Sequence, residues 1–478
     1  MAPLDYIIFA IYMAGVLSVG IYHFLRNKNL DDYYVGGRAL GWGHVGMSVV
    51  ATDVGGGFSI GLGGLGFSMG LAGSWLLFTG LLGAWLSAVI FIPRVKRLDS
   101  QISMLTYPDL LRWRYGKGTA LFAAAISGIG YLGFTGGQIL AGAKLASVTV
   151  FSTAPFGLSS MTFALLMIAV ITIAYTVFGG LKAVIYTDSV QWLILLVGLL
   201  FFALPAALHA VGGWSGMRET LPRNHFDLLE ISPVQLVNWS VTIVPIWFIG
   251  MTLYQRIYAC KDVETARKAW FFAGLLEWPL MAFAGVLLGM AARVLFPSVE
   301  AEMGLPLLIA EVLPAGIAGL VIAAYFSAIM STADSCLMAS SGNLVGDLIS
   351  KLLPWASEDK IQIRLSQFVT GLVGLAAVLL AMRFQTVLDA ILHAYAFMVS
   401  GLLVPTIGVF YSKRGDGKAA VTSMVAGGGF TLAAISFHWE LPGKLDPAFF
   451  GILLAFFAFV GVALICPGAK RESMKSTH

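Results

Sequence analysis

The stretch SAIMSTADSC (residues 327–336) places four hydroxyl side chains and one carboxylate in a segment that is otherwise apolar enough to cross a membrane. Its three serines are spaced by four residues and share one helix face, which Thr332 and Asp334 flank. A carboxylate at bilayer depth is costly unless it has a partner or lines a cavity. The pattern therefore predicts an ion site in a membrane helix.

The oxygen-rich character of this stretch favours a hard cation. A single hydroxyl in a membrane helix most often bonds back to a carbonyl of its own helix, but four beside a carboxylate suggest a shared ligand. Hydroxyl and carbonyl oxygens suit a cation such as Na⁺. The three cysteines occur singly, so the sequence predicts neither a transition-metal site nor a disulfide framework.

The composition is that of a polytopic membrane protein. Of 478 residues, 58% are hydrophobic and only 11% are charged, which excludes an ordinary soluble domain. Apolar runs long enough to cross about 30 Å of hydrocarbon recur along the chain. We predict thirteen spans, at residues 5–25, 44–68, 72–92, 119–149, 160–178, 182–208, 233–256, 268–295, 315–349, 364–382, 386–411, 418–437 and 447–466.

The first span and the basic residues predict the orientation. The first run is too long for a signal-peptide core and has no basic leader, so we expect it to be retained and the chain to begin at or near Met1. With the N-terminus outside, the inner loops and tail hold 23 Lys and Arg residues, the outer loops hold five, and Lys144 lies inside a span. This asymmetry predicts N-out and C-in. We assign Arg256 to an inner loop and expect Lys144 to extend its amine outward.

A second polar stretch, ATDVGGGFSIG (residues 51–61), interrupts the second predicted span. Asp53 is a carboxylate at depth, and three successive glycines lack the side chains that favour helical backbone. Carbonyl groups freed by a helix break can coordinate a cation. A small-residue packing seam is the alternative for the glycines alone, but Asp53 beside them favours a functional break.

A third stretch, GGLKAVIYTDSVQ (residues 179–191), opens the sixth span. Asp188 lies about two turns into the membrane from the predicted inner side. It can act as an ion exit station or as part of a cation site, or it can pair with a lysine or cap a neighbouring helix.

Other intramembrane polar residues give weaker signals. Glu277 precedes a Trp-Pro pair and is interpreted as part of a proline kink, whereas Gln138, Trp247 and Tyr395 are as well explained by packing. The sequence contains no Walker A loop, catalytic-triad pattern or HExxH motif, so an ATP-driven pump and an intramembrane protease are disfavoured.

Five motifs together resemble the sodium/solute symporter family, which includes sodium-coupled sugar, proline, pantothenate, sialic acid and monocarboxylate carriers. They are DDYYVGGR (31–38), ATDVGG (51–56), GGLKAVIYTDSVQ (179–191), QRIYACKDVETARKA (255–269) and MSTADS (330–335). They cover about two-thirds of the chain in the expected order.

The resemblance implies the leucine-transporter fold, an all-α polytopic architecture of thirteen transmembrane helices: one helix, a ten-helix core of two inverted five-helix repeats, and two more helices. The expected divisions are 1–43 (first helix and cytoplasmic loop), 44–208 (first repeat), 209–232 (extracellular loop), 233–411 (second repeat) and 412–478 (last two helices and cytoplasmic tail).

The resemblance also implies a main Na⁺ site between the broken first core helix and core helix 8. The expected ligands are the carbonyl oxygens of Ala51, Val54 and Ala328 and the hydroxyls of Ser331 and Thr332. Asp53 is expected to support the unwound segment and couple ion to solute.

A second cation site, or an exit path, would involve Asp188, Ser331, Asp334 and Ser335. Asp334 departs from the serine associated with this site in relatives, and it can either strengthen a cation site or hold a proton.

The solute is expected near the bilayer midplane beside the glycines. The expected lining residues are Gly55, Gly56, Phe58, Gln138, Trp247 and Tyr395, and a small neutral, zwitterionic or monocarboxylate solute fits better than a bulky acidic sugar.

The expected function is Na⁺-coupled symport of a small organic solute into the cell by alternating access, with one or two Na⁺ ions and no enzymatic activity. The expected location is the cell membrane, the inner membrane in a bacterium, with lipid and the solute as partners and neither nucleic acid nor an obligate protein partner. One alternative is a proton-coupled carrier that uses Asp53, Asp188 or Asp334. The other is a transporter-like sensor, which the short tail after the last helix disfavours.

Overall fold

The computed structural model describes residues 1–24, 35–155, 157–178, 181–353 and 358–465. These residues form helices and loops, with one isolated parallel β-bridge between Leu40 and Cys260. Several features of the sequence lie outside these residues: residues 31–34 and Gly179–Gly180 of the motifs, Arg26, Lys28, Lys470, Arg471 and Lys475 of the charge asymmetry, and Cys466.

The first half of the chain, up to the loop before Pro233, contains α1 (Pro3–Phe24), α3 (Trp42–Asp53), α4 (Gly55–Met69), η1 (Gly70–Ser74), α5 (Trp75–Ile90), α6 (Ile92–Ile102), α7 (Tyr107–Tyr115), α8 (Lys117–Val148), α9 (Ser160–Phe178), α10 (Leu181–Val197), η2 (Gly198–Ala203), α11 (Leu204–Ala210), α12 (Gly213–Thr220) and η3 (Arg223–Phe226).

The second half contains α13 (Pro233–Ile249), α14 (Met251–Ala259), α15 (Val263–Leu275), η4 (Leu276–Met281), α16 (Ala282–Leu295), α17 (Ala301–Val312), α18 (Ile317–Ser341), η5 (Gly342–Ile349), α19 (Ser350–Leu352), α20 (Asp359–Ala381), α21 (Val387–Tyr411), α22 (Gly417–Ser436), η7 (Pro442–Lys444) and α23 (Pro447–Ile465). Here η2, η4 and η5 are π-helical, and the other η segments are 3₁₀-helical.

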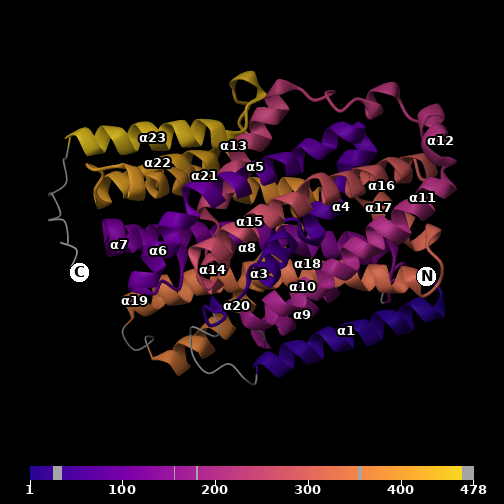
Figure 1. Cartoon of the computed structure of the whole chain (residues 1–478), viewed down its shortest axis with the longest axis horizontal. Coiled ribbons are helices and arrows are strands. Elements are labelled where there is room, and N and C mark those ends of the chain that lie inside the picture. The colour runs from indigo at the N-terminus through magenta and orange to yellow at the C-terminus, as the bar shows by residue number, and fades with distance from the viewer. Residues whose placement is uncertain (25–34, 156, 179–180, 354–357, 466–478) are drawn as a thin grey trace.

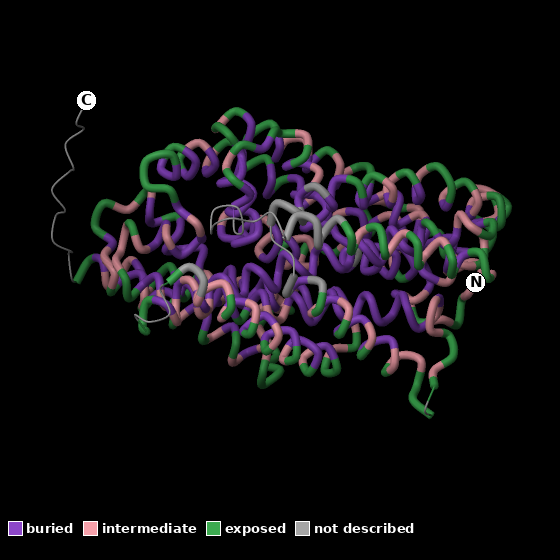
Figure 2. Tube along the Cα trace, turned by 90° about the horizontal axis from the view of Figure 1, so that it is seen from below, coloured by how far each residue is buried: buried purple, intermediate pink, exposed green. Residues whose placement is uncertain are grey.

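The long helices form a bundle with α8 and α18 inside it (Figure 1). α18 packs against α8, α10 and α4, and nearly all of its side chains are buried. α1 covers one side of the bundle through contacts with α18 and α10, whereas α22 and α23 pack on each other and on α21. Figure 2 shows the buried residues concentrated along the interior of this bundle. The polar stretch on α18 therefore faces protein and not lipid.

Each predicted span overlaps helical structure, but length and hydropathy alone give a smaller number of crossings. Within the described residues nine helices are long and apolar enough to cross a membrane, or ten if the bent pair α13 and α14 is one span. Two shorter apolar helices, Pro3–Ser18 and Ser160–Ala174, lie at the first and fifth predicted spans. The chain is thus a multi-pass helical protein, and the count of thirteen stays a prediction.

Two helix breaks lie close to the buried polar residues inside the bundle. The break expected in the second span is present but narrow: α3 ends at Asp53 and α4 begins at Gly55, whose φ is +31°. The glycines that follow are helical, contrary to the longer unwound segment that we expected. A second break, absent from the sequence prediction, separates α13 from α14 at Gly250, where the axes bend by 42°.

Candidate functional site

The α3/α4 break lies directly against the hydroxyl-rich face of α18. Thr332 Oγ1 is 3.0 Å from the carbonyl oxygen of Ala51 and 3.1 Å from that of Ala328, so its hydroxyl can donate to either. A Cβ on Gly55 would overlap Thr332 Oγ1. Only a glycine therefore lets the two helices approach this closely at this point. The structure brings together three of the five residues expected to bind the main Na⁺ ion.

The other two expected ligands, Val54 and Ser331, are also buried and are close in sequence to Ala51 and Thr332. Val54 forms the break itself and is fully buried. Ser331 is buried, and its Oγ has no hydrogen-bond partner among the described residues, although the side chain lies close to the carboxylate of Asp188. Buried hydroxyls are normally paired, so the unpaired Ser331 Oγ is an oxygen atom that a cation can use.

A buried ion pair lies on the other side of this region. Arg256 Nη2 is 3.1 Å from Asp188 Oδ2, and both side chains are fully buried. The guanidinium also donates to Ser48, Thr52 and Ser335, over 2.9 Å, 2.5 Å and 3.1 Å. The assignment of Arg256 to an inner loop is therefore wrong: α14 continues beyond the predicted span end to Ala259 and carries Arg256 inside the protein.

Asp188 consequently has a cationic partner, as the alternative interpretation allowed, but the partner is an arginine. Ser48 Oγ also donates to Asp188 Oδ2 over 2.5 Å, while Asp188 Oδ1 has no partner among the described residues. Asp188 and Ser335 both already contact the guanidinium of Arg256. Their binding of a second cation therefore stays a prediction.

Asp334 makes different contacts from Asp188 and Ser335. Its Oδ1 accepts a hydrogen bond from Thr176 of α9, and its Oδ2 has no partner within the described part of the chain. The predicted second site is therefore divided between Arg256 on one side and α9 on the other. Thr176 was not predicted, since nothing local in the sequence connects it to a residue 158 positions later.

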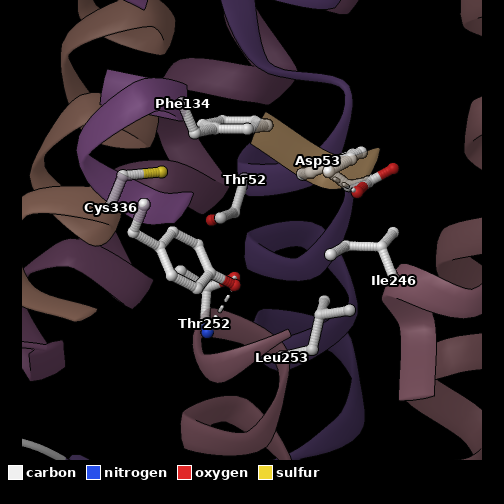
Figure 3. Close-up of a pocket in the computed structure, with 9 residues that line it drawn as sticks. Thr52, Asp53, Phe134, Ile246, Thr252, Leu253 and Cys336 are labelled. Carbon is white, nitrogen blue, oxygen red and sulfur yellow. Dashed lines mark hydrogen bonds between the residues drawn. The ribbon is translucent and has the colours of Figure 1, made fainter. Parts of the chain in front are cut away.

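A small cavity lies between the two helix breaks. It is lined by Thr52, Asp53, Tyr131, Phe134, Ile246, Thr252, Leu253, Cys336 and Tyr395 (Figure 3). Its volume is about 10 Å³, close to the minimum that holds one water molecule. An organic solute would need the surrounding helices to move apart before it could enter.

The expected solute-lining residues are only partly at this cavity. Of these residues Tyr395 lines it, and its Oη donates over 3.4 Å to Oδ1 of Asp53, the expected coupling residue, which lines the cavity too. Phe58 packs against Tyr395 with ring centroids 6.1 Å apart. Gln138 Oε1 accepts from the Gly57 backbone N–H over 3.2 Å, and its Nε2 has no partner among the described residues.

Of the other expected residues, Gly55 and Gly56 begin α4 at the break. Trp247 is not among the lining residues. It is buried against Gly83 of α5, and its carbonyl oxygen accepts from Ser87 over 3.1 Å.

Two of the residues that the sequence prediction missed follow a readable pattern. Tyr131, Phe134 and Gln138 are spaced by three and four residues on α8, so they share one face of that helix. Tyr131 Oη and Thr252 Oγ1 are 3.1 Å apart, and Thr252 follows the break at Gly250. A helix break is thus a signal for lining residues in the turn after it.

The expectation for Lys144 is wrong. Its ammonium group is buried and contacts Glu300, Glu302 and the carbonyl oxygen of Gln385, with 2.6 Å to Glu302 and 2.7 Å to Gln385. Glu302 in turn accepts from the backbone N–H groups of Val387 and Leu388 at the start of α21. Lys144 therefore joins α8, α17 and α21 inside the protein.

Broken membrane helices with buried carbonyls, hydroxyls and carboxylates at the breaks are typical of secondary transporters. Residues 33–427 match the model of the sodium:solute symporter family. The chain belongs to this family, and the recognition from the five motifs is confirmed. It is a transporter and not an enzyme, and Na⁺ coupling with a small-molecule substrate is the activity that its family supports.

Relatives transport different solutes. The chain is 28% identical over 480 residues to the mouse (Mus musculus) sodium/myo-inositol cotransporter 2, covering 89% of this chain and 69% of the relative. It is also 28% identical to the high-affinity proline transporter PutP of Bacillus subtilis, covering 95% of this chain and 96% of PutP.

Solved structures support the fold. A Na⁺-coupled sialic acid symporter in a substrate-bound, outward-open state superimposes with a TM-score of 0.80 at 20% identity, over 98% of this chain and 99% of that one. Mhp1, a nucleobase-cation-symport-1 family transporter in a closed conformation, gives 0.60 at 14% identity, over 91% and 95%. These similarities show the architecture of leucine-transporter-fold proteins and leave the solute open.

Proposed function

We propose that this protein is a Na⁺/solute symporter of the cell membrane that carries a small organic solute inward by alternating access. The observation that supports this most directly is the contact between the α3/α4 break and Thr332 of α18, where two carbonyl oxygens lie 3.0 Å and 3.1 Å from one hydroxyl. A Na⁺ ion bound there by Ala51, Val54, Ala328, Ser331 and Thr332 would tie the two helices together.

The proposed topology is the one expected from the sequence: thirteen spans, N-out and C-in, with two inverted repeats at 44–208 and 233–411. Burial of Arg256 removes one cation from the inner loops and leaves the asymmetry of Lys and Arg strong.

Coupling requires that Na⁺ and the solute favour the same conformation. One Na⁺ ion moving through 100 mV contributes about 2.3 kcal/mol, which supports roughly 50-fold accumulation of a solute. Asp53 is suited to a coupling role because it ends the helix beside the ion ligands and also lines the small cavity.

The test uses purified protein and thermal unfolding with myo-inositol, L-proline, D-glucose and sialic acid, each in NaCl and in KCl. A coupled solute should raise the unfolding temperature more in Na⁺, since ligands stabilise the state they bind. Uptake into proteoliposomes then measures the Na⁺ concentration for half-maximal transport. Ser331→Ala and Thr332→Ala should raise it about tenfold or more, by loss of a buried ligand to a charge.

Thr370→Ala is the matched control, because Thr370 is also buried and back-bonded to a carbonyl four residues earlier, on α20. Na⁺ activation that Thr332→Ala leaves unchanged would contradict the ion site. Uptake driven by a pH gradient without Na⁺ would favour proton coupling through Asp53, Asp188 or Asp334.

A further inference from the structure

Two carboxylates converge at the centre of the protein, and only one of them was singled out from the sequence. Asp53 ends α3, and Glu277 lies in the π-helical segment between α15 and α16. A Cβ on Gly80 of α5 would lie 2.5 Å from Glu277 Oε2 and 3.9 Å from Asp53 Oδ2. Because a Cβ at position 80 would overlap Glu277 Oε2, only a glycine there lets the two carboxylates lie beside α5 at the same point.

Neither acid is neutralised by the described residues around it. Glu277 is fully buried, and both of its carboxylate oxygens lack a hydrogen-bond partner within the described residues. Asp53 is 6% exposed and has one long hydrogen bond, from Tyr395. No ion pair joins either acid to a described basic residue, so the interpretation of Glu277 as a mere kink residue leaves two unpaired oxygens unexplained.

The buried cations of the described chain are committed elsewhere. Lys96 binds Asp99, Lys144 binds Glu302, and Arg256 binds Asp188. Removing a charge from water without a partner is strongly unfavourable. The acids at Gly80 therefore need a positive charge or a proton that the described residues do not supply.

The cavity next to Asp53 has walls that suit a cation with an apolar body. Tyr131, Phe134 and Tyr395 contribute aromatic rings, and the rings of Phe134 and Tyr395 stack with centroids 5.0 Å apart. Aromatic faces attract ammonium groups. Ile246 and Leu253 add aliphatic surface for the carbon part of a solute.

We infer that the transported solute carries a positively charged amino group, which binds between Asp53 and Glu277 while its carbon skeleton lies against the aromatic rings. This inference deepens the proposed symport function and rests on it. A solute with an exposed carboxylate fits poorly, because the described residues around the two acids offer no unpaired cation to bind it. The monocarboxylate class becomes the least suitable of those expected from the sequence.

The experiment compares solutes that differ only in the amino group. The probes are putrescine and 1,4-butanediol, ethanolamine and ethylene glycol, and D-glucosamine and D-glucose, each tested by thermal unfolding of the purified full chain in NaCl and in KCl. We expect at least one amine to raise the unfolding temperature in NaCl when its hydroxyl counterpart does not. Glu277→Gln should weaken apparent binding of that amine about tenfold or more.

Glu264→Gln is the control, since Glu264 is an exposed carboxylate paired only with Lys268 on the surface of α15, and binding should not change. If Glu277→Gln fails to fold, the comparison of each amine with its hydroxyl counterpart on the wild-type protein still tests the inference. Absence of any amine response, or equal responses to both members of each pair, overturns the inference.

The two levels of the proposal fail separately. A neutral solute that stabilises the protein only in NaCl, with no response to any amine, would overturn the amine site and leave Na⁺ symport standing. An amine that binds equally in NaCl and KCl would support the amine site and contradict Na⁺ coupling.

Discussion

Arg256 and Asp188 form a fully buried ion pair, with 3.1 Å between Nη2 and Oδ2, that joins α14 beyond the Gly250 bend to α10. The same arginine donates to hydroxyls on α3 and α18. One side chain thus holds the two broken helices and α18 in a single arrangement.

Loss of Arg256 should be more damaging than loss of the whole pair. Arg256→Gln leaves Asp188 buried and unpaired, which costs about 3–5 kcal/mol. The double variant Arg256→Gln/Asp188→Asn removes both charges and should recover much of that stability. Chemical unfolding of the four members of this double-mutant cycle measures the difference. A double variant whose destabilisation equals the sum of the two single variants would mean that the pair carries no coupling energy.

Gly55 is the position where substitution should act on the proposed Na⁺ site most directly. Gly55→Ala adds a Cβ that overlaps Thr332 Oγ1 at a φ of +31°, so α18 must move away from the break. We expect weaker Na⁺ activation and a stability loss of about 1–3 kcal/mol. Gly43→Ala, on α3, the helix before the break, and with open space around its Cβ position, should be neutral or slightly stabilising. Similar Na⁺ activation curves for the two variants would argue against the proposed Na⁺ site.

The sequence predicted the α3/α4 break and its partner helix because both signals are local: glycines beside Asp53, and hydroxyls four residues apart. The Gly250 bend was missed because a single glycine in an apolar run resembles ordinary packing. Lys144 was misassigned because its partner Glu302 lies 158 residues away, and hydropathy carries no information about such contacts. Family membership followed from motif order, whereas the solute depends on how Asp53 and Glu277 meet in space.

Lys144 should be essential for stability although it lies in an apolar helix. Lys144→Met leaves Glu302 buried with only backbone N–H donors, so we expect a loss of about 3–5 kcal/mol. Lys268→Met is the control, because Lys268 pairs with Glu264 at the exposed surface of α15, where such pairs contribute about 0–1 kcal/mol. Thermal unfolding in detergent compares the two. If the Lys144 side chain only extended outward, Lys144→Met and Lys268→Met should lose equally little stability.

His225, which lies outside the predicted membrane spans, should make the stability of the protein depend on pH. Its Nε2 is 2.9 Å from Arg293 Nη1 and 3.4 Å from the carbonyl oxygen of Phe67. Burial, together with the charge of Arg293, lowers the pKa of His225 below its ordinary value. The folded state therefore resists a proton that the unfolded chain accepts near pH 6.5.

Stability should consequently fall as the pH drops below about 6.5, because the unfolded state then binds more protons than the folded state. His225→Gln keeps an acceptor for Arg293 and does not titrate, so it should lessen this loss of unfolding temperature on acidification. The exposed His209 on α11 provides the control variant His209→Gln. If His225→Gln and wild-type protein lose the same stability between pH 7.5 and pH 5.5, other groups cause the acid sensitivity, and the buried neutral state of His225 contributes nothing to it.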